Sequence, residues 1–433
     1  MKWQEKYASK LVTASEAVSH VKSGDKVIFG DWIAEPPALA DALVARAPEL
    51  ENVEIIHGIS PGKLEYIKPE YEGIFHHTAV FLEKRTAAAY REGRIDYIGG
   101  TNFHEWPTMF RVSEKLNPHW AFIMLAEPDE DGYCSFGYDC SFTFPAADTA
   151  TLGVIAQINP KMPQVGGQKI HVDDIDWLVD AETPLHIIPK AEASPKIQTI
   201  ADYCAELVQD GATLQFGIGA LPDAIARNLT SKKHLGVHSE TLTTALMDLV
   251  KAGALDNSMK TINRGVCIGA QAAGTQEFYD FIDGNPMFEV HPVDYVNDPL
   301  VIGQNYRQTS VNSCMEVDLK GQVNSETVNG YQVTGIGGQL DHVRGAQLSE
   351  GGISILALNS TAKNDTISKI VLDFAPCNVT TVPRYDVQYI VTEYGVANMK
   401  YKTERERARA LINIAHPKFR EQLEFDAKKM CLL

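Results

Sequence analysis

Short apolar runs of strand length recur along the chain and alternate with stretches of helical pattern. Two clear examples are Ile353–Leu358 and Lys369–Phe374, which lack the strict apolar–polar alternation of a half-exposed strand. Such continuous runs are typical of strands buried on both faces, as in a parallel sheet. Strands of this kind alternating with helices predict an α/β fold with largely parallel sheets.

A strand–turn–helix pattern occurs twice, over residues 24–43 and 211–229. In both places an apolar strand ends in Phe-Gly, and the following helix has proline near its first position, where the missing N–H is not needed. A second apolar strand follows in each copy, at Val53–His57 and at Leu235–His238. The two regions are therefore candidates for copies of one plan.

Two further pairs of strings repeat in the same order. Ile98-Gly99-Gly100 with His104 resembles Ile336-Gly337-Gly338 with His342, and residues 174–179 resemble residues 386–391. Four shared strings predict a tandem duplication of a domain-sized unit. We expect two similar open α/β domains in tandem, covering 1–190 and 191–433 and joined near the prolines of 184–195.

Composition and charge narrow the class of protein. The 433 residues are 44% apolar and carry a net charge of −17, which argues against nucleic acid and anionic membranes as partners. The start of the chain lacks a signal peptide's apolar core, and no apolar run reaches the length of a transmembrane helix. The seven cysteines are scattered, so a disulfide scaffold or zinc knuckle is not indicated. We expect a cytoplasmic protein.

The two copies differ at the end of their second strand. Aligning Ile56–Ile59 with Val237–Glu240 sets a carboxylate, Glu240, where the first copy has Ile59. Open α/β sheets bind ligands at the carboxyl ends of their strands, which is where this residue falls. From the residues alone, a functional carboxylate and a solvent-facing loop glutamate remain equally open.

Two glycine-rich turns lie in the second half, at Gly217–Pro222 and Gly335–Gly338. A turn that leads into a helix can present backbone N–H groups to an anion or an oxyanion. Neither turn fits the dinucleotide-binding pattern, and no phosphate-binding P-loop sequence occurs. Glycines that merely permit tight turns remain an alternative for each turn taken alone. No metal site is predicted, because His238 near Glu240 lacks a second ligand at suitable spacing.

Several strings together resemble the acetyl-CoA hydrolase/transferase family, and within it the 4-hydroxybutyrate and butyryl-CoA:acetate CoA-transferases. The resemblance spans nearly the whole chain and is densest from 211 to 420. The strings that carry it are Phe216–Ala226, Leu235–Glu240, Val296–Pro299, Glu316–Glu326, Thr334–Gly345 and Val391–Gly395.

The resemblance implies a class I CoA-transferase with two similar open α/β domains, the second carrying the catalytic glutamate. It makes Glu240 the nucleophile and places Asn297 and Gly338 in the oxyanion holes and the CoA pocket. It also implies CoA contacts, at Gly217, Ile218, Gly219, Ala220 and Leu221, with Met315, Gly338 and Lys363. CoA and acyl-CoA would be substrates with no tightly bound cofactor, and a homodimer or higher homo-oligomer is expected.

The implied reaction moves CoA between acetyl-CoA and a short-chain carboxylate such as 4-hydroxybutyrate or butyrate. It would run by a ping-pong route through an acyl-glutamyl anhydride and a glutamyl-CoA thioester. Glu240 must be ionised to attack, so we expect its site to supply hydrogen-bond donors rather than simple burial. Two alternatives remain: an acyl-CoA hydrolase using the same glutamate, and a non-catalytic metabolite sensor. The chain departs from common family residues at Gln157, His342 and Asn398–Tyr401.

Overall fold

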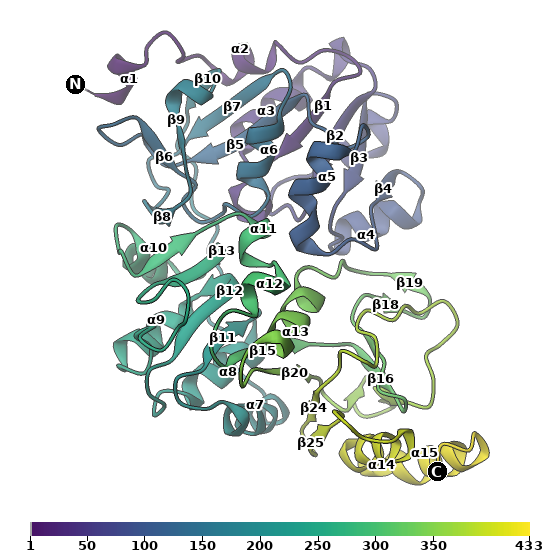
Figure 1. The fold of residues 1–433 in the computed structure, drawn as a ribbon. Coiled ribbons are helices and arrows are strands. Elements are labelled where there is room, and N and C mark those ends of the chain that lie inside the picture. The colour runs from purple at the N-terminus through teal and green to yellow at the C-terminus, as the bar shows by residue number, and fades with distance from the viewer. Residues whose placement is uncertain (1) are drawn as a thin grey trace. The chain divides into compact units, whose positions relative to one another are not determined.

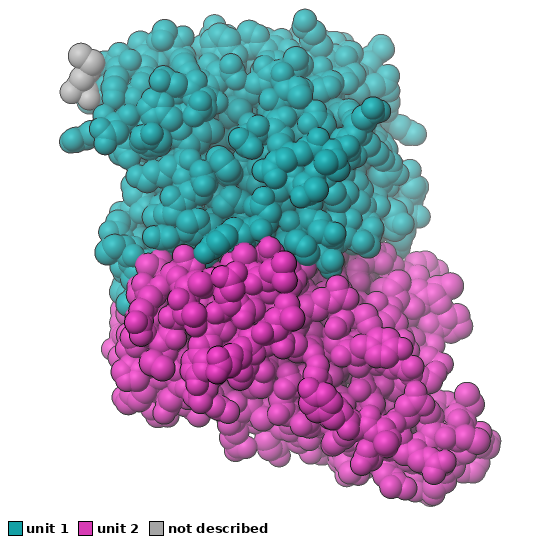
Figure 2. Space-filling model, viewed as in Figure 1, with its two compact units in different colours: residues 1–188, 268–296 teal, residues 189–267, 297–433 magenta. Residues whose placement is uncertain are grey.

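The computed structural model describes residues 2–433, which form two compact units (Figure 2). Unit 1 contains the residues up to Ile188 together with Ile268–Val296, and unit 2 contains Pro189–Cys267 with Asn297–Leu433. The units are thus not the contiguous stretches 1–190 and 191–433. The segment from Ile268 belongs to unit 1 because its backbone is hydrogen-bonded there: Cys140 N donates to Ala270 O, at 2.9 Å, and Ala272 N donates to Tyr138 O, at 2.8 Å.

Unit 1 is built on a sheet of seven parallel strands (Figure 1). The order across the sheet is β10 (Trp177–Asp180), β7 (Gly153–Ile158), β5 (Trp120–Leu125), β1 (Lys26–Phe29), β2 (Val53–His57), β3 (Phe75–Ala79) and β4 (Ile95–Tyr97). Strands β5 and β7 are buried along their whole length. The connecting helices are α2 (Ala14–Val18), α3 (Pro37–Ala45), α4 (Lys84–Arg91), α5 (Trp106–Val112) and α6 (Thr143–Thr149), and the later segment adds β13 (Cys267–Ala273), α10 (Gln276–Ile282), β14 (Phe288–Val290) and α11 (Val293–Val296).

The sheet of unit 2 is also largely parallel. Its strands follow the order β25 (Gly395–Asn398), β24 (Tyr389–Thr392), β20 (Ile353–Ala357), β15 (Gln308–Ser313), β11 (Thr213–Phe216) and β12 (Gly236–Thr243), with β25 antiparallel to β24. Its helices are α7 (Pro195–Leu207), α8 (Ala220–Asn228), α9 (Thr244–Lys251), α12 (Pro299–Ile302), α13 (Gln339–Leu348), α14 (Glu404–Ile414) and α15 (Pro417–Lys429). The predicted α/β fold with largely parallel sheets is confirmed.

The strand order bears on the duplication seen in the sequence. Unit 1 runs β10-β7-β5-β1-β2, and unit 2 runs β24-β20-β15-β11-β12, so five strands correspond one to one. The paired strings at 24–43 and 211–229, and at 174–179 and 386–391, lie on equivalent elements. The third pair does not: His104 precedes α5 and β5, whereas His342 lies in α13, which leads to β20, the counterpart of β7. That likeness was therefore misleading, because glycine pairs before helices recur wherever a tight entry turn is needed.

The strand register also corrects the position aligned with Glu240. Val27 pairs with Ile55, and Leu214 pairs with Val237. Counting on, the counterpart of Glu240 is Gly58 and not Ile59. A Cβ atom at Gly58 would lie 2.2 Å from Asp31 Oδ1, so unit 1 has no room for a side chain where unit 2 carries its carboxylate.

A second expectation was wrong. Residues Lys369–Phe374, predicted as a buried strand, contain only the two-residue strand β23 (Ile370–Val371). This strand pairs with β16 (Glu316–Asp318) in a small separate sheet, and Asp373 is exposed. The run lies on the surface of a core cluster, so only Ile370 is fully buried. Within residues 2–433, no helix combines the length and apolar character that crossing a bilayer requires.

Candidate active site

Strand β12 presents a single side chain at its surface. Seven of its eight residues are buried, and Glu240 alone is half-buried. The strand pairs in parallel with β11, its neighbour in the sheet. Glu240 therefore has a backbone fixed by the sheet and a carboxylate that solvent or a ligand can reach.

Asn297 holds one oxygen of this carboxylate. Its side-chain amide Nδ2 donates a hydrogen bond of 2.7 Å to Glu240 Oε2. Asn297 is fully buried and directly precedes Asp298, whose side chain caps the short helix α12 by accepting from Leu300 N at 2.8 Å. The cap and the burial fix the Asn297 amide in place, and its hydrogen bond to Oε2 therefore orients the Glu240 carboxylate.

Gly338 closes the site from the start of α13. Its backbone N–H donates to the Glu240 carboxylate, and it is the N-cap residue of that helix. A Cβ atom at this position would lie 2.0 Å from Asn297 Nδ2 and 2.2 Å from Glu240 Oε2. Because its φ of −92° is open to any residue, glycine is required here by space and not by backbone conformation.

Burial dominates the electrostatics of Glu240. Loss of solvent around the carboxylate, together with the nearby charge of Asp341, raises its pKa from 4.5 to about 7, against the lowering effect of the Asn297 and Gly338 hydrogen bonds. The expected donors are thus present, but they do not outweigh burial. The carboxylate is held near the midpoint of its titration at neutral pH. Asp341, buried in the first turn of α13, was not singled out from the sequence although it lies three residues after Gly338.

The glycine turn at residues 217–221 follows β11, next to the Glu240 strand. Ser239 Oγ donates to Phe216 O at 3.2 Å, which ties the two strand ends together. Gly219 has a φ of 120° and precedes helix α8, and no atom lies within 4 Å of where a Cβ would stand on Gly217 or Gly219. The side chain of Ile218 is 41% exposed. The turn is therefore open on its outer side, with room for a ligand against its backbone.

Met315 and Lys363 lie beyond the carboxyl ends of two other parallel strands. Met315 follows β15 and is half-buried, and Lys363 is exposed in the turn between β21 (Thr361–Ala362) and β22 (Ile367–Ser368), after β20. The fold brings three of the predicted site residues into contact, namely Glu240, Asn297 and Gly338. The other predicted residues lie at the same edge of the sheet; these are the turn at 217–221, Met315 and Lys363. That edge is where open α/β sheets bind ligands.

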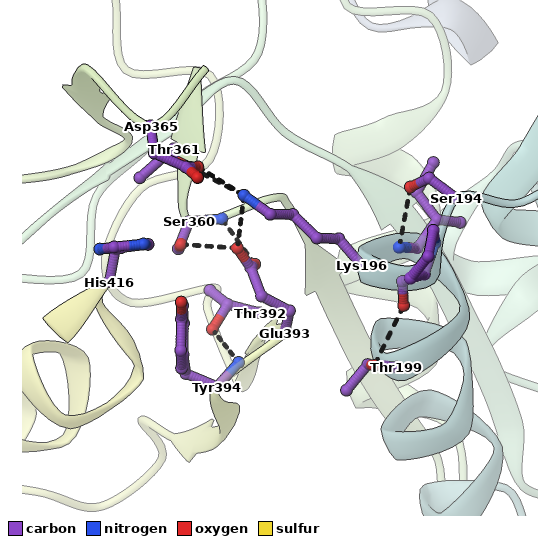
Figure 3. Close-up of polar contacts among 12 residues, drawn as sticks. Ser194, Lys196, Thr199, Ser360, Thr361, Asp365, Thr392, Glu393, Tyr394 and His416 are labelled. Atoms are coloured by element: carbon purple, nitrogen blue, oxygen red, sulfur yellow. Dashed lines mark hydrogen bonds and ion pairs between the residues drawn. The ribbon is translucent and has the colours of Figure 1, made fainter. Parts of the chain in front are cut away.

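The Lys363 turn has an unusual backbone and a polar support (Figure 3). Lys363, Asn364 and Asp365 all have left-handed φ, at 47°, 53° and 61°. Such a run is unfavourable for non-glycine residues and persists only when neighbours hold it. Asp365 accepts hydrogen bonds from Lys196 Nζ and Thr361 Oγ1.

The same support continues into the Val391–Gly395 string. Glu393, whose side chain is 7% exposed, accepts from Ser360 N and Ser360 Oγ, both at 2.8 Å, and lies 3.8 Å from Lys196 Nζ. Figure 3 shows Lys196 reaching from α7 to both acids. This network anchors the two ends of the turn that carries Lys363.

Two of the departures from common family residues have a structural explanation. Gln157 accepts from Ala38 N and donates to Ala181 O and Thr183 Oγ1, a pattern that a carboxylate at this position could not complete. His342 is fully buried in α13, and burial lowers its pKa to about 3, so it packs as a neutral ring.

Comparison with known proteins identifies the family of this chain. The N-terminal domain of the acetyl-CoA hydrolase/transferase family matches residues 1–189, and its C-terminal domain matches residues 274–427. The chain belongs to this family. It is 46% identical to the 4-hydroxybutyrate coenzyme A transferase of Clostridium kluyveri, over 99% of this chain and 100% of that one.

Two further relatives place the chain in the same family. The butyryl-CoA:acetate CoA-transferase of Anaerostipes caccae is 36% identical over 99% of this chain and 98% of its own. The crystal structure of RipA from Yersinia pestis is 35% identical, covers 100% of both chains and superposes with a TM-score of 0.92. The family and fold inferred from the sequence are thus confirmed.

Proposed function

We propose that this family member transfers CoA between an acyl-CoA and a short-chain carboxylate, with Glu240 as a covalent nucleophile. The observation that carries the proposal is the contact of one Glu240 oxygen with both Asn297 and Gly338. Asn297 donates to Oε2 and Gly338 closely approaches the same oxygen, so we assign the attack to the other oxygen, Oε1. A pKa of about 7 leaves a substantial ionised fraction at neutral pH.

The first half of the reaction has two steps. Oε1 attacks the thioester carbonyl and the C–S bond breaks. CoA departs as a thiolate, and a mixed acyl-glutamyl anhydride remains on Glu240. The thiolate then attacks Glu240 Cδ, the bond between Cδ and Oε1 breaks, and the donor acid departs, leaving a glutamyl-CoA thioester. In the second half, an acceptor carboxylate attacks the glutamyl-CoA thioester, which gives a new acyl-glutamyl anhydride and releases the CoA thiolate. The thiolate then attacks the acyl carbonyl of that anhydride, so a new acyl-CoA leaves and the Glu240 carboxylate is regenerated. No net oxidation or proton uptake is needed.

Each step passes through an oxyanion that needs donors. In the attack on Cδ the negative charge develops on Oε2, which Asn297 and Gly338 already contact. Removal of one such donor typically costs about 3–4 kcal/mol of transition-state stabilisation. For the acyl carbonyl, we assign the backbone N–H groups of the open turn at Gly217–Leu221. Met315 and Lys363 are assigned to CoA, which is a substrate here and not a resident cofactor.

We propose 4-hydroxybutyrate and butyrate as the first carboxylates to test, with acetyl-CoA as donor. This choice is supported by the names of the relatives from Clostridium kluyveri and Anaerostipes caccae. By the same family resemblance we propose a cytoplasmic homodimer or higher homo-oligomer, which light scattering on the purified protein tests.

The decisive experiment follows CoA esters by chromatography after mixing enzyme with acetyl-CoA and 4-hydroxybutyrate, butyrate or no acceptor. We expect a new acyl-CoA with an acceptor and little free CoA without one. Release of CoA at a rate indifferent to added carboxylate would instead identify a hydrolase, the other activity in the family's name. Borohydride reduction during turnover, followed by peptide mass spectrometry, should modify Glu240. An unmodified Glu240 with no turnover would support the non-catalytic alternative.

A further inference from the structure

One cavity of unit 2 has a charge opposite to that of the whole chain. It measures about 390 Å³ and lies where β25 leads into α14. Five of its lining residues are cationic and one is acidic, in a chain of net charge −17. The cations are Lys320, Arg384, Lys400, Lys402 and Arg407, and the acid is Glu404. None of them takes part in the proposed transferase site.

The charges in this cavity are only partly neutralised. Arg384 Nη1 donates to Glu404 Oε1 at 2.8 Å, and Lys320 Nζ lies 3.8 Å from Asp373. Arg407 uses its donors on the carbonyls of Lys320, Met399 and Arg384, so it adds charge and fixes the wall. Lys402 is exposed and makes no side-chain hydrogen bond within residues 2–433, and Glu406 is an acid close enough to interact with its charge. Clustered like charges repel one another, and an anion bound among them relieves that repulsion.

Two tyrosine rings stand at the same cavity. Tyr385 is 75% exposed and Tyr401 is 98% exposed. Tyr401 also has a left-handed φ of 58°, a conformation that glycine adopts without strain and tyrosine does not. The Arg384 guanidinium lies over the Tyr385 ring, 5.3 Å from its centre. A strained and fully exposed aromatic residue between two lysines contributes nothing to the core, so its ring is available to a ligand.

We propose that this cavity binds a nucleotide polyphosphate. Lys402, Lys320 and Arg384 supply positive charge for the phosphates, and the tyrosine rings supply flat faces on which a base stacks. The volume falls within the range of small-molecule sites. The proposed ligand is a free nucleotide such as ATP. Because β25 runs antiparallel to β24, the cavity lies at the edge of the sheet opposite to the proposed CoA contacts.

Isothermal titration calorimetry of the full-length protein at low ionic strength tests the proposal, with ATP, ADP and inorganic tripolyphosphate as probes. We expect saturable ATP binding that weakens with added salt and exceeds tripolyphosphate binding. Tyr401→Gly should weaken ATP binding about fivefold or more, through loss of stacking, while leaving the melting temperature unchanged or higher. Lys402→Gln should weaken it about two- to fivefold, and Lys22→Gln, an exposed lysine of unit 1, should not.

The same titration with saturating CoA tests whether this cavity is separate from the CoA site. We expect ATP binding to survive saturating CoA. ATP binding abolished by CoA, together with a raised KM for acyl-CoA in Tyr401→Gly, would overturn the proposal of a separate nucleotide site. The proposal is overturned if ATP and ADP show no saturable binding at millimolar concentration. It is also overturned if tripolyphosphate binds as tightly as ATP and Tyr401→Gly changes nothing. Neither result depends on whether the transferase activity is found.

Discussion

Replacing Glu240 by glutamine should make the protein more stable at pH 8 and leave its stability nearly unchanged at pH 5. Burial raises the pKa of Glu240 in the folded chain to about 7 from its usual 4.5. Between these values the folded state binds a proton that the unfolded state does not, so stability falls as pH rises through this window. Above pH 7 the full cost of an ionised carboxylate is present, and below 4.5 it is absent.

The size of the effect follows from the pKa difference. At about 1.4 kcal/mol per tenfold change, the cost of ionisation has an upper bound of roughly 3 kcal/mol. Because Glu240 keeps some exposure, solvent screens part of this, and about 1–2 kcal/mol is expected. In a unit of roughly 220 residues, that corresponds to a rise in melting temperature of about 2–8 °C. The amide oxygen of the substituted glutamine can still accept the Asn297 hydrogen bond, so little else is lost.

Differential scanning calorimetry of wild type and Glu240→Gln at pH 5, 6, 7 and 8 measures this difference. Glu206→Gln, an exposed substitution in the same unit, controls for the loss of a carboxylate as such. We expect the advantage of Glu240→Gln to grow between pH 5 and pH 8. An advantage of equal size at every pH, or a less stable variant at pH 8, would refute the idea that burial holds this carboxylate near neutrality.

Three further outcomes are expected. Gly338→Ala should lower transferase activity at least about 100-fold, because the added Cβ displaces Asn297 Nδ2 and Glu240 Oε2. Gly217→Ala is the control: its Cβ meets no atom within 4 Å, so this variant should stay folded and lose less activity. Equal activities of the two variants would contradict the packing argument. The rate of the half-reaction with acyl-CoA should rise with pH through about 7, because the ionised form attacks; stopped-flow rates that do not change between pH 6 and 8 would speak against Glu240 as nucleophile. Lys196→Met should raise the KM for acyl-CoA several-fold with little change in kcat, because the substitution removes the hydrogen bond to Asp365 that anchors the Lys363 turn. Lys196→Arg should restore a KM close to that of the wild type. A fall in kcat alone would argue against a positioning role.

Much of the fold could be predicted from local pattern. The apolar run now seen as β20 is buried along nearly all of its length, and burial on both faces is what favours apolar residues in a parallel strand. The run 369–374 shows where this fails, because apolar content alone does not say which sheet a segment joins. Similarly, segment 268–296 carries no boundary signal in its sequence; backbone hydrogen bonds to residues 138–141 and 164–168 tie it to unit 1.

By itself, the sequence determined the α/β class, the duplicated plan and the family, and through the family strings it singled out Glu240 as a candidate, because strand composition and family strings are local properties of the chain. Tertiary structure decided what surrounds that residue. The contact of Asn297 and Gly338 with one oxygen, the influence of Asp341, and the match of Glu240 with Gly58 all depend on residues far apart in sequence. The pKa of Glu240 is set by the atoms packed around its carboxylate, so the sequence alone does not show that burial outweighs the two hydrogen bonds.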